Sequence, residues 1–398
     1  MSDERPFRSL KFGKTLIYRK TGEEPFPHIF LDKAKPLQGW YKNATDPVRP
    51  RPCFTEATLV QPYGGYCPLS CAFCYVNMGL RGYRATKRVT VCPMYVDQIH
   101  RQISRWYVAS SFYITPFHEP FNVLEETYHN TRNIAGLATE LGLPVFFLSR
   151  LIYPDWAKDI LQANPYSYAQ KSIVTSNPTI HRKLSPGGAS LEDQWRDISD
   201  LRRKNIYVSI QLNPVFLGII DEGDVLNLIR LLAKHGANHV IVKFVEVQLC
   251  SWKEFLSTVN NRFGVPSARI ENLFTEVQGA QRTIPEDTRR KLHEVFQKEA
   301  TSCGMTYATC YEYDRVGRNS LGRLYCTADQ CHGKAVPIFY RNKLTEKFRP
   351  FDGCEPSGCL YCERKLCNHP SLTQAKAMRD KDYRIPLNSA DNCSKPLT

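Results

Sequence analysis

The chain has 398 residues, 42% of them hydrophobic and 12% aromatic, which is enough to bury one large core. Its 53 lysines and arginines against 39 acidic residues give a formal charge of +14, which favours a polyanionic partner such as DNA or a nucleotide. The stretch MSDERPFRSLKFGK lacks the apolar segment of an export signal, and no apolar run is long enough to span a membrane. The 15 cysteines are therefore expected in a reducing compartment, bound to metal or clusters rather than joined as disulfides.

The first predicted segment comprises residues 1–52. It is basic and interrupted by prolines, it ends in DPVRPRP, and it shows no strong periodicity. We expect an arm that packs on the main domain or reaches a ligand.

The second segment, residues 53–309, alternates between strand-like and helix-like stretches. Short apolar stretches occur at 57–61, 111–115, 144–149, 171–176, 206–212 and 239–247. Helix-like stretches occur at 123–141, 190–205, 221–236, 251–264 and 286–302, and Gly236 is a candidate C-cap. Apolar strands separated by helices predict a parallel sheet covered by helices. We therefore predict an α/β fold with a partial (βα)6 barrel.

Three cysteines follow the first predicted strand. The stretch CPLSCAFCY places Cys67, Cys71 and Cys74 in a C-x3-C-x2-C pattern, with Phe73 inside the last gap and Tyr75 after it. Loops after parallel strands lie at the edge of the sheet where such folds place active sites. A structural zinc site takes four protein ligands, so three local thiols predict a [4Fe–4S] cluster with one open iron. A zinc site completed by a distant ligand is the alternative.

This motif, with an aromatic residue before the last cysteine and a (βα) barrel around it, resembles that of radical S-adenosylmethionine (SAM) enzymes. By this resemblance, Cys67, Cys71 and Cys74 hold the cluster, whose open iron chelates SAM. An electron from the cluster then cleaves SAM, and the 5′-deoxyadenosyl radical takes a hydrogen atom from the substrate. The resemblance also implies an electron donor such as flavodoxin or ferredoxin.

Two further segments are similar to the spore photoproduct lyase group. They are EPFNVLEETYHNTR at 119–132 and SIVTSNPTIHRKLSPGGASLEDQWRDISDLRRKNIYVSIQLNPVFLGIID at 172–221. The resemblance implies a SAM pocket in which Arg150 faces the SAM carboxylate and Ser172 meets the ribose or methionyl group. The full set of expected cofactor-binding residues is Phe73, Tyr75, Arg150, Ser172, Gln211 and Asn213. The alternative is that the polar residues among them are ordinary rim residues, with Arg150 in a surface ion pair.

Three residues near the second predicted strand are candidate catalytic residues. Glu119 stands where the resembled group has an aspartate, and Tyr113 and His118 are candidates to face the pocket. A helix N-terminal acid is the alternative for Glu119. Spore photoproduct lyase carries a hydrogen-donating cysteine near its second strand, and SFYITPFHEP (111–120) has none. The resemblance therefore implies a radical reaction other than dimer splitting.

The third segment, residues 310–398, is predicted to be a cysteine-rich metal-binding module. Its candidate ligands are Cys326, Cys331, Cys354, Cys359, Cys362 and Cys367. Closely spaced thiols suit a second [4Fe–4S] cluster or zinc, and buried free thiols are the third interpretation. These cysteines loosely resemble the auxiliary-cluster extensions of radical SAM enzymes. Residues 334–351 lie between Cys331 and Cys354. We expect them either to contact a phosphate and a base or to form a hairpin packed on the barrel.

The resemblance and the charge together predict a radical SAM enzyme that modifies or isomerises a thymine base in DNA, similar to phage isomerases that hypermodify thymine. A base in a duplex would have to be flipped out to reach the radical. A peptide or a small metabolite is the alternative substrate. A non-enzymatic zinc protein that binds nucleic acid is the alternative of another class. The first hypothesis places the protein in the cytoplasm of a bacterial or phage-infected cell.

Overall fold

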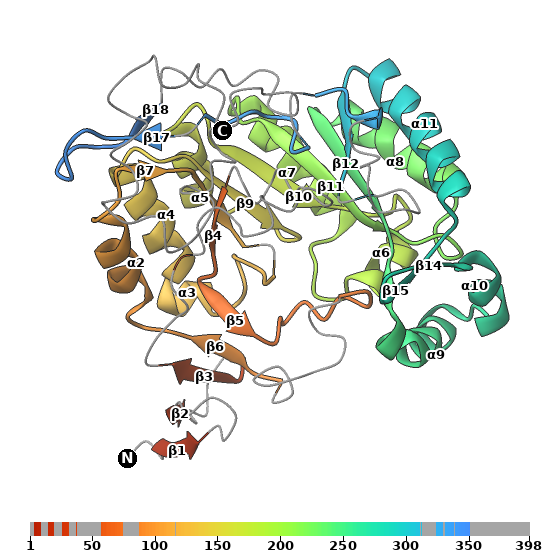
Figure 1. The fold of residues 1–398 in the computed structure, drawn as a ribbon, viewed down its shortest axis with the longest axis horizontal. Helices are drawn as coiled ribbons and strands as arrows, with labels where there is room; N and C mark the ends of the chain where they lie inside the picture. Colours follow the sequence, from red (N-terminus) through yellow and green to blue (C-terminus); the bar gives the residue numbers. More distant parts are fainter. Residues whose placement is uncertain are drawn as a thin grey trace, which may run out of the picture.

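A seven-stranded parallel sheet forms the centre of the protein (Figure 1). The computed structural model describes residues 4–8, 15–19, 26–31, 37, 57–74, 87–115, 117–310, 312, 324–328, 331–337 and 339–350. The strands lie in the order β16-β12-β11-β10-β9-β8-β4, so the sheet follows the order of the chain. They are β4 (Ala57–Val60), β8 (Ser111–Ile114), β9 (Val145–Ser149), β10 (Tyr168–Ser172), β11 (Val208–Val215), β12 (His239–Phe244) and β16 (Thr306–Thr309).

Helices between the strands cover the outer face of this sheet. They are α2 (Tyr95–Ile103), α3 (Glu125–Tyr128), α4 (Asn130–Glu140), α5 (Asp155–Gln162), α6 (Pro178–Leu184), α7 (Leu191–Arg203), α8 (Glu222–Lys234) and α11 (Glu286–Ser302). Phe147 of β9 packs against Trp156 of α5 with ring centroids 6.1 Å apart, and Phe244 of β12 packs against His293 of α11 at 4.9 Å. The predicted α/β fold with a parallel sheet is confirmed. Within the described ranges, no helix combines the length and apolar character needed to cross a bilayer.

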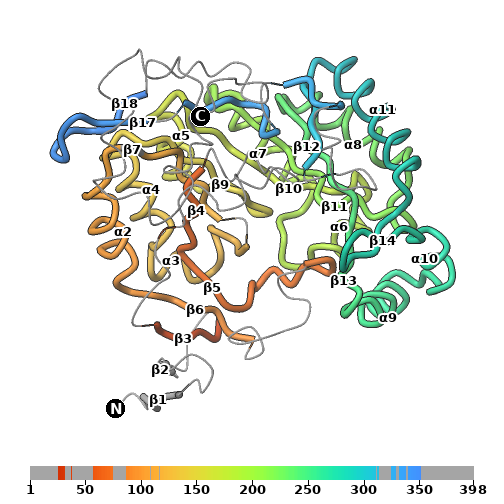
Figure 2. Tube along the Cα trace, in the orientation of Figure 1, coloured from red at the N-terminus to blue at the C-terminus, as the bar shows by residue number. Residues whose placement is uncertain are grey.

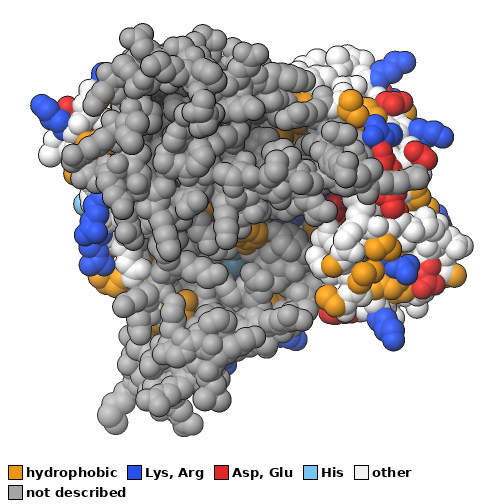
Figure 3. All heavy atoms as spheres, in the orientation of Figure 1, with side chains coloured by type: hydrophobic (Ala, Val, Ile, Leu, Met, Phe, Trp, Pro, Cys, Tyr) orange, Lys and Arg blue, Asp and Glu red, His pale blue; other side chains and the backbone are white. Residues whose placement is uncertain are grey.

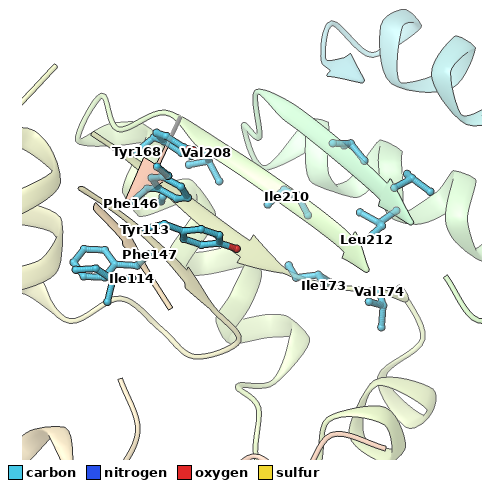
Figure 4. Packing of buried hydrophobic residues seen from close by; sticks show 14 of the residues in the cluster. Tyr113, Ile114, Phe146, Phe147, Tyr168, Ile173, Val174, Val208, Ile210 and Leu212 are labelled. Atoms are coloured by element: carbon cyan, nitrogen blue, oxygen red, sulfur yellow. The ribbon is translucent and has the colours of Figure 1, made fainter. Parts of the chain in front are cut away.

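The inner face of the sheet carries a stack of aromatic rings (Figure 4). Tyr113, Phe146 and Tyr168 are register partners on β8, β9 and β10, and successive ring centroids lie 4.4 and 4.5 Å apart. Because side chains alternate along a strand, this face is opposite to that of Phe147. The ring of His332 meets these rings edge-on, and its Nδ1 lies 2.7 Å from the hydroxyl of Tyr168. The stack fills the sheet's inner face near its amino ends.

A second sheet joins the N-terminal strands to the main domain. Its order is β1-β2-β3-β6-β5, with β1 (Glu4–Arg8), β2 (Thr15–Arg19), β3 (His28–Leu31), β6 (Val89–Val91) and β5 (Tyr63–Gly65). His28 and Tyr128 connect this sheet to the helical layer, with the Tyr128 hydroxyl 2.5 Å from His28 Nε2. Strand β3 pairs with β6 in parallel, so this described strand of residues 1–52 lies beside the segment that begins at residue 53.

An insertion between β12 and α11 forms a small separate layer beside α6 (Figure 1). It consists of β13 (Val247–Gln248), α9 (Trp252–Phe263), α10 (Ser267–Leu273), β14 (Glu276–Gln278) and β15 (Gln281–Thr283), with a 3-10 turn at Leu249–Ser251. The strands form a sheet in the order β13-β15-β14. Arg262 of α9 donates to the carbonyl of Lys183 at the end of α6, so the insertion lies against the carboxyl-edge loops of the main sheet.

The described part of the C-terminal segment packs back on the domain that holds the main sheet. Strands β17 (Phe339–Tyr340) and β18 (Arg349–Pro350) form a hairpin that pairs with β7 (Val108–Ala109), more than 200 residues earlier in the chain (Figure 2). Arg341 is buried and donates to the carbonyls of Ile103 and Trp106. Of the two predictions for residues 334–351, the packed hairpin is the one observed.

Candidate active site at the carboxyl edge of the sheet

The cysteine loop lies at the carboxyl edge of the sheet and is held against the loop that follows α6. The amide of Ala72 donates to the carbonyl of Leu184 at 2.9 Å, and the amide of Gly187 donates to the carbonyl of Leu69 at 3.2 Å. A Cβ atom on Gly187 would lie 2.7 Å from the Cα of Leu69, a backbone atom that cannot move aside cheaply. Only glycine therefore allows these two loops to touch as closely as they do.

The three thiols of this loop fit a cluster better than a closed metal site. Burial raises the pKa of the Cys67 thiol, and the neighbouring Cys71, Glu119 and Cys74 raise it further. Within the described part of the chain, no three His, Cys, Asp or Glu side chains are already gathered as a metal site, this loop included. The loop supplies three soft thiol donors, a ligand type that binds metals as thiolates. This donor set suits a [4Fe–4S] cluster whose fourth iron is left to an external ligand.

Arg150 connects the cysteine loop to the ends of two strands. It follows β9, and its guanidinium lies over the ring of Phe73, 4.8 Å from the ring centroid. Its Nη2 donates to the carbonyl of Asn213 at 3.1 Å, and its Nη1 lies 3.2 Å from Ser185 Oγ and 3.4 Å from the carbonyl of Ser172. The predicted residues Phe73, Arg150, Ser172 and Asn213 are thus brought together around one guanidinium.

Ser185 extends this arrangement to a predicted cluster ligand. Its Oγ accepts from Arg150 and lies 3.6 Å from the sulfur of Cys71. Neither Ser185 nor Gly187 was predicted as a functional residue, although both belong to the LSPGG stretch inside a segment that resembles spore photoproduct lyase. That stretch was the available signal, because a serine and glycines directly after a helix are candidates for a close loop contact.

Ser172 and Gln211 lie on the inner face of the sheet near the carboxyl ends of β10 and β11. They are register partners, and both are buried. Gln211 Nε2 donates to Oε1 of Gln170, which precedes Ser172 by two residues and therefore faces the same way. Among the residues that the structure describes, none pairs with the Nε2 of Gln170. These amides and the serine form a polar inner wall above the aromatic stack.

The predicted catalytic residues near β8 have different surroundings. The Glu119 carboxylate accepts from Ser149 Oγ at 2.6 Å and from the amides of Arg150 and Phe121 at 3.0 and 3.2 Å. Burial raises the pKa of this carboxyl, and these hydrogen bonds oppose the rise. Glu119 therefore fixes the turn that carries Arg150, and it does not belong to the first turn of α3.

Tyr113 and His118 are also buried. Tyr113 is a member of the inner aromatic stack. His118 has Nε2 at 3.1 Å from the carbonyl of Tyr66 and Nδ1 at 3.2 Å from that of Glu119, so its ring links the loop after β8 to the residue before Cys67. The structure thus places Tyr113 on the inner face of the main sheet and His118 against the backbone just before the cysteine loop.

The structure describes only part of the predicted metal-binding tail. Cys326 directs its sulfur at the carbonyl of Ala328, and the carbonyl of Cys331 faces Nε2 of His239. Neither belongs to a preformed metal site among the described residues. Five other predicted site residues lie outside the described residues: Tyr75, Cys354, Cys359, Cys362 and Cys367.

Comparison with known proteins gives one sequence relative and a structural neighbour. A protein of Pseudomonas phage M6 named radical SAM Nα-GlyT isomerase is 47% identical over 375 residues, which cover 90% of this chain and 78% of the relative. A variant of spore photoproduct lyase has a similar fold, with a TM-score of 0.50 and 13% identity over 63% of this chain and 75% of that one. No protein-family model matches the chain.

Proposed function

The chain belongs to the radical SAM enzymes, and we propose that it isomerises a thymine base in DNA that carries an amino acid. The support for this substrate is the name of the phage relative, in which we take GlyT to mean a thymine joined to glycine through the glycine nitrogen. An isomerase keeps every atom of its substrate, so a hydrogen atom removed to start the rearrangement must be returned at its end. The absence of a donor cysteine from residues 111–120 agrees with such a reaction.

Family membership implies SAM and a [4Fe–4S] cluster, and the residues of the carboxyl edge would hold them. We assign the cluster to Cys67, Cys71 and Cys74. The loaded cluster would supply the electron that cleaves SAM, which generates the radical that removes the hydrogen atom. The protein's contribution is to orient the reactants and exclude water from the radical.

The observation that supports the assignment of the SAM site is the position of Arg150. A guanidinium that contacts the Phe73 ring of the cysteine motif and the carbonyls of Ser172 and Asn213 is fixed beside the cluster loop. Such a fixed cation is suited to the carboxylate of SAM. Ser172 and Gln211 then line the inner wall against which the nucleoside would lie. In this assignment Glu119 is a positioning residue for Arg150, and Tyr113 and His118 shape the pocket.

The charge of the chain supports DNA as the carrier of the base. The net charge of +14 would attract a polyanion, and binding should weaken as salt competes. Figure 3 shows basic side chains along the edge of the molecule on the side of α2, whose last turn carries His100 and Arg101. The inner wall lies inside the barrel, so a thymine in a duplex would have to be flipped out to reach it.

We propose that the cysteine-rich tail binds a second [4Fe–4S] cluster, with zinc as the alternative. The support is the spacing of its cysteines alone. A non-enzymatic zinc protein does not fit a chain that belongs to an enzyme family. A peptide or a metabolite remains the competing substrate class.

The test uses anaerobically reconstituted protein with SAM and dithionite. We expect 5′-deoxyadenosine to form faster with an oligonucleotide that carries Nα-glycyl-thymine than with unmodified DNA. With a substrate deuterated on the glycyl group, the label should appear in the 5′-deoxyadenosine that is released before the hydrogen is returned. With an unlabelled substrate, the product should have the mass of the substrate. If a peptide or metabolite stimulates the reaction and the modified DNA does not, the substrate assignment is wrong while the enzyme class stands.

A further inference from the structure

We propose that Lys243 and Glu246 form the subsite for the charged amino-acid group of the substrate, an inference that rests on the function proposed above. A glycine attached through its nitrogen keeps a carboxylate and a secondary amine that is protonated near neutral pH. Lys243 would bind the carboxylate, and Glu246 would bind the ammonium. The two residues lie on β12 and just after it, one strand beyond the β10–β11 wall.

The side-chain alternation of β12 directs Lys243 toward the inside of the barrel. His239 begins this strand, and its ring lies between Thr306 and the carbonyl of Cys331, the residue before His332 in the inner aromatic cluster. Lys243 is four residues later and therefore faces the same side. Phe244 faces the other way and packs against His293 of α11. The ammonium of Lys243 is thus presented at the carboxyl end of the inner face.

Lys243 and Glu246 form an ion pair that is partly exposed. Their charged atoms are 3.0 Å apart, and the side chains are 15% and 14% exposed. The neighbouring pair of Arg289 and Glu312 is sealed, with each side chain 1% exposed. Glu312 is also committed to the amide of Phe244, at 2.7 Å. The partly exposed pair can therefore accept an external charged group without loss of the sealed one.

The surrounding carboxylates favour the charged form of Lys243. Burial alone would lower the pKa of Lys243, but the carboxylates of Glu246 and Glu312 raise it above its ordinary value. A ligand that carries only a negative charge would be attracted by Lys243 and repelled by Glu246, because the pair is neutral overall. A zwitterion has no such conflict, since each of its charges meets the opposite charge of the pair.

The position of the pair also separates it from the proposed SAM site. Arg150 is fixed by Phe73, Ser185 and the carbonyl of Asn213 beside the cysteine loop. SAM and the substrate each carry an amino-acid group. Arg150, directly after β9, and Lys243, on β12, would give each carboxylate its own cation. This arrangement would prevent the substrate from competing for the SAM anchor.

The experiment measures the binding of labelled duplexes by fluorescence anisotropy, with SAM present and no reductant. Three duplexes carry Nα-glycyl-thymine, its amide without the carboxylate, or an ether analogue with oxygen in place of the amine. Wild-type protein should prefer the first over each analogue by about tenfold to hundredfold, as expected for a hydrogen bond between charged groups. Lys243→Met should reduce the preference over the amide to about twofold and keep the preference over the ether. Glu246→Gln should reduce the preference over the ether to about twofold and keep the preference over the amide.

The crossed pattern separates a binding role from a loss of folding, because each variant is required to keep one preference. Lys234→Met, at an exposed position at the end of α8, is the matched control and should keep both. If either single variant fails to fold, the double variant K243M/E246Q removes both charges together and should lose both preferences.

Three results would overturn the inference. The first two contradict the subsite, and the third contradicts the proposed function as well. If the wild type shows no preference over either analogue, the subsite is wrong. If the wild type converts the glycyl-thymine duplex but both variants keep both preferences, the subsite alone is wrong. If the wild type neither binds nor converts that duplex, the proposed function and the subsite fall together.

Discussion

The guanidinium of Arg150 lies 4.8 Å from the ring centroid of Phe73, so a residue after the third strand of the main sheet contacts the cysteine motif directly. The contact is supported from behind, because the Glu119 carboxylate accepts from the amide of Arg150. A cation over an aromatic face gains electrostatic stabilisation, and a planar guanidinium can do this while it donates hydrogen bonds. The orientation of Arg150 is therefore set before any ligand binds.

Replacement of Arg150 should weaken SAM binding. We expect Arg150→Gln to raise the Kd for SAM about tenfold to hundredfold, the range for loss of a charged hydrogen bond. Equilibrium dialysis with labelled SAM on reconstituted protein measures this. Arg196→Gln, which removes a guanidinium that is 70% exposed on α7, is the control and should bind SAM like the wild type. An unchanged Kd in Arg150→Gln would remove this residue from the SAM site.

A methyl group at Gly187 should displace the cysteine loop. The added Cβ would lie 2.7 Å from the Cα of Leu69, so one of the two loops must shift. We expect Gly187→Ala to bind less iron and to lose SAM cleavage while the rest of the barrel stays folded. Gly136→Ala on α4 is the control, since nothing lies within 4 Å of its Cβ and alanine favours a helix. Iron analysis of both variants measures cluster loading, and circular dichroism measures folding. Full iron loading in Gly187→Ala would contradict the expected displacement of the cysteine loop.

The sequence was informative about the main strands and less so about where they end. Residues 171–176 were predicted as a strand, whereas β10 runs from Tyr168 to Ser172. Ile173 and Val174 are buried although they follow the strand, because apolar packing continues into the rim of the barrel. Strand β16 was not predicted at all, since its four residues TYAT have no distinctive pattern.

Helix boundaries depended in the same way on individual side chains. The helix predicted at 123–141 is broken at His129, whose φ of 52° lies in the left-handed region. The break is stabilised by Glu125, which accepts from the amides of Thr131 and Arg132 at the start of α4. A helical periodicity does not reveal such a cap, because the capping residue sits within the pattern. By contrast, the prediction at 286–302 coincides with α11.

The candidate site was predictable where strand ends carry polar residues, and not where loops meet. Arg150 and Ser172 follow or end apolar strands, and the parallel sheet brings such positions to one edge. Ser185 and Glu246 are in loops, and their contacts with Cys71 and Lys243 depend on how those loops fold. Distances of this kind follow from tertiary packing and leave no local pattern in the sequence.

Cysteine substitutions should distinguish the two proposed metal sites by their iron content. Replacement of Cys67, Cys71 and Cys74 by alanine should remove about four irons per chain and abolish 5′-deoxyadenosine formation. Cys359→Ala should remove about four irons of its own if the tail holds a second cluster. Iron and zinc analysis with electron paramagnetic resonance measures both. Continued SAM cleavage by the triple variant would refute the cluster assignment, and an unchanged iron count with lost zinc in Cys359→Ala would make the tail a zinc site.

The buried ring of His293 should make the fold sensitive to mild acid. Burial, and then the positive charges of Arg289 and Lys243, lowers the pKa of His293 to about 3. In the unfolded chain its pKa is near the ordinary value of 6.5, so the unfolded state binds a proton first as pH falls. The stability linked to His293 is fully present above pH 6.5 and is lost as pH falls toward 3. Between pH 7 and pH 5 this group should cost about 2 kcal/mol of unfolding free energy.

The variant His293→Gln isolates this contribution. The ring contacts the hydroxyl of Tyr307 at 2.7 Å, so the variant is expected to be less stable at every pH. The informative quantity is the difference in unfolding free energy between pH 7 and pH 5, measured by urea denaturation, which should shrink by about 2 kcal/mol relative to the wild type. His100→Gln, at an exposed position on α2, should keep the wild-type difference. If His293→Gln also keeps it, His293 does not titrate as its burial requires, and another group sets the acid sensitivity of the fold.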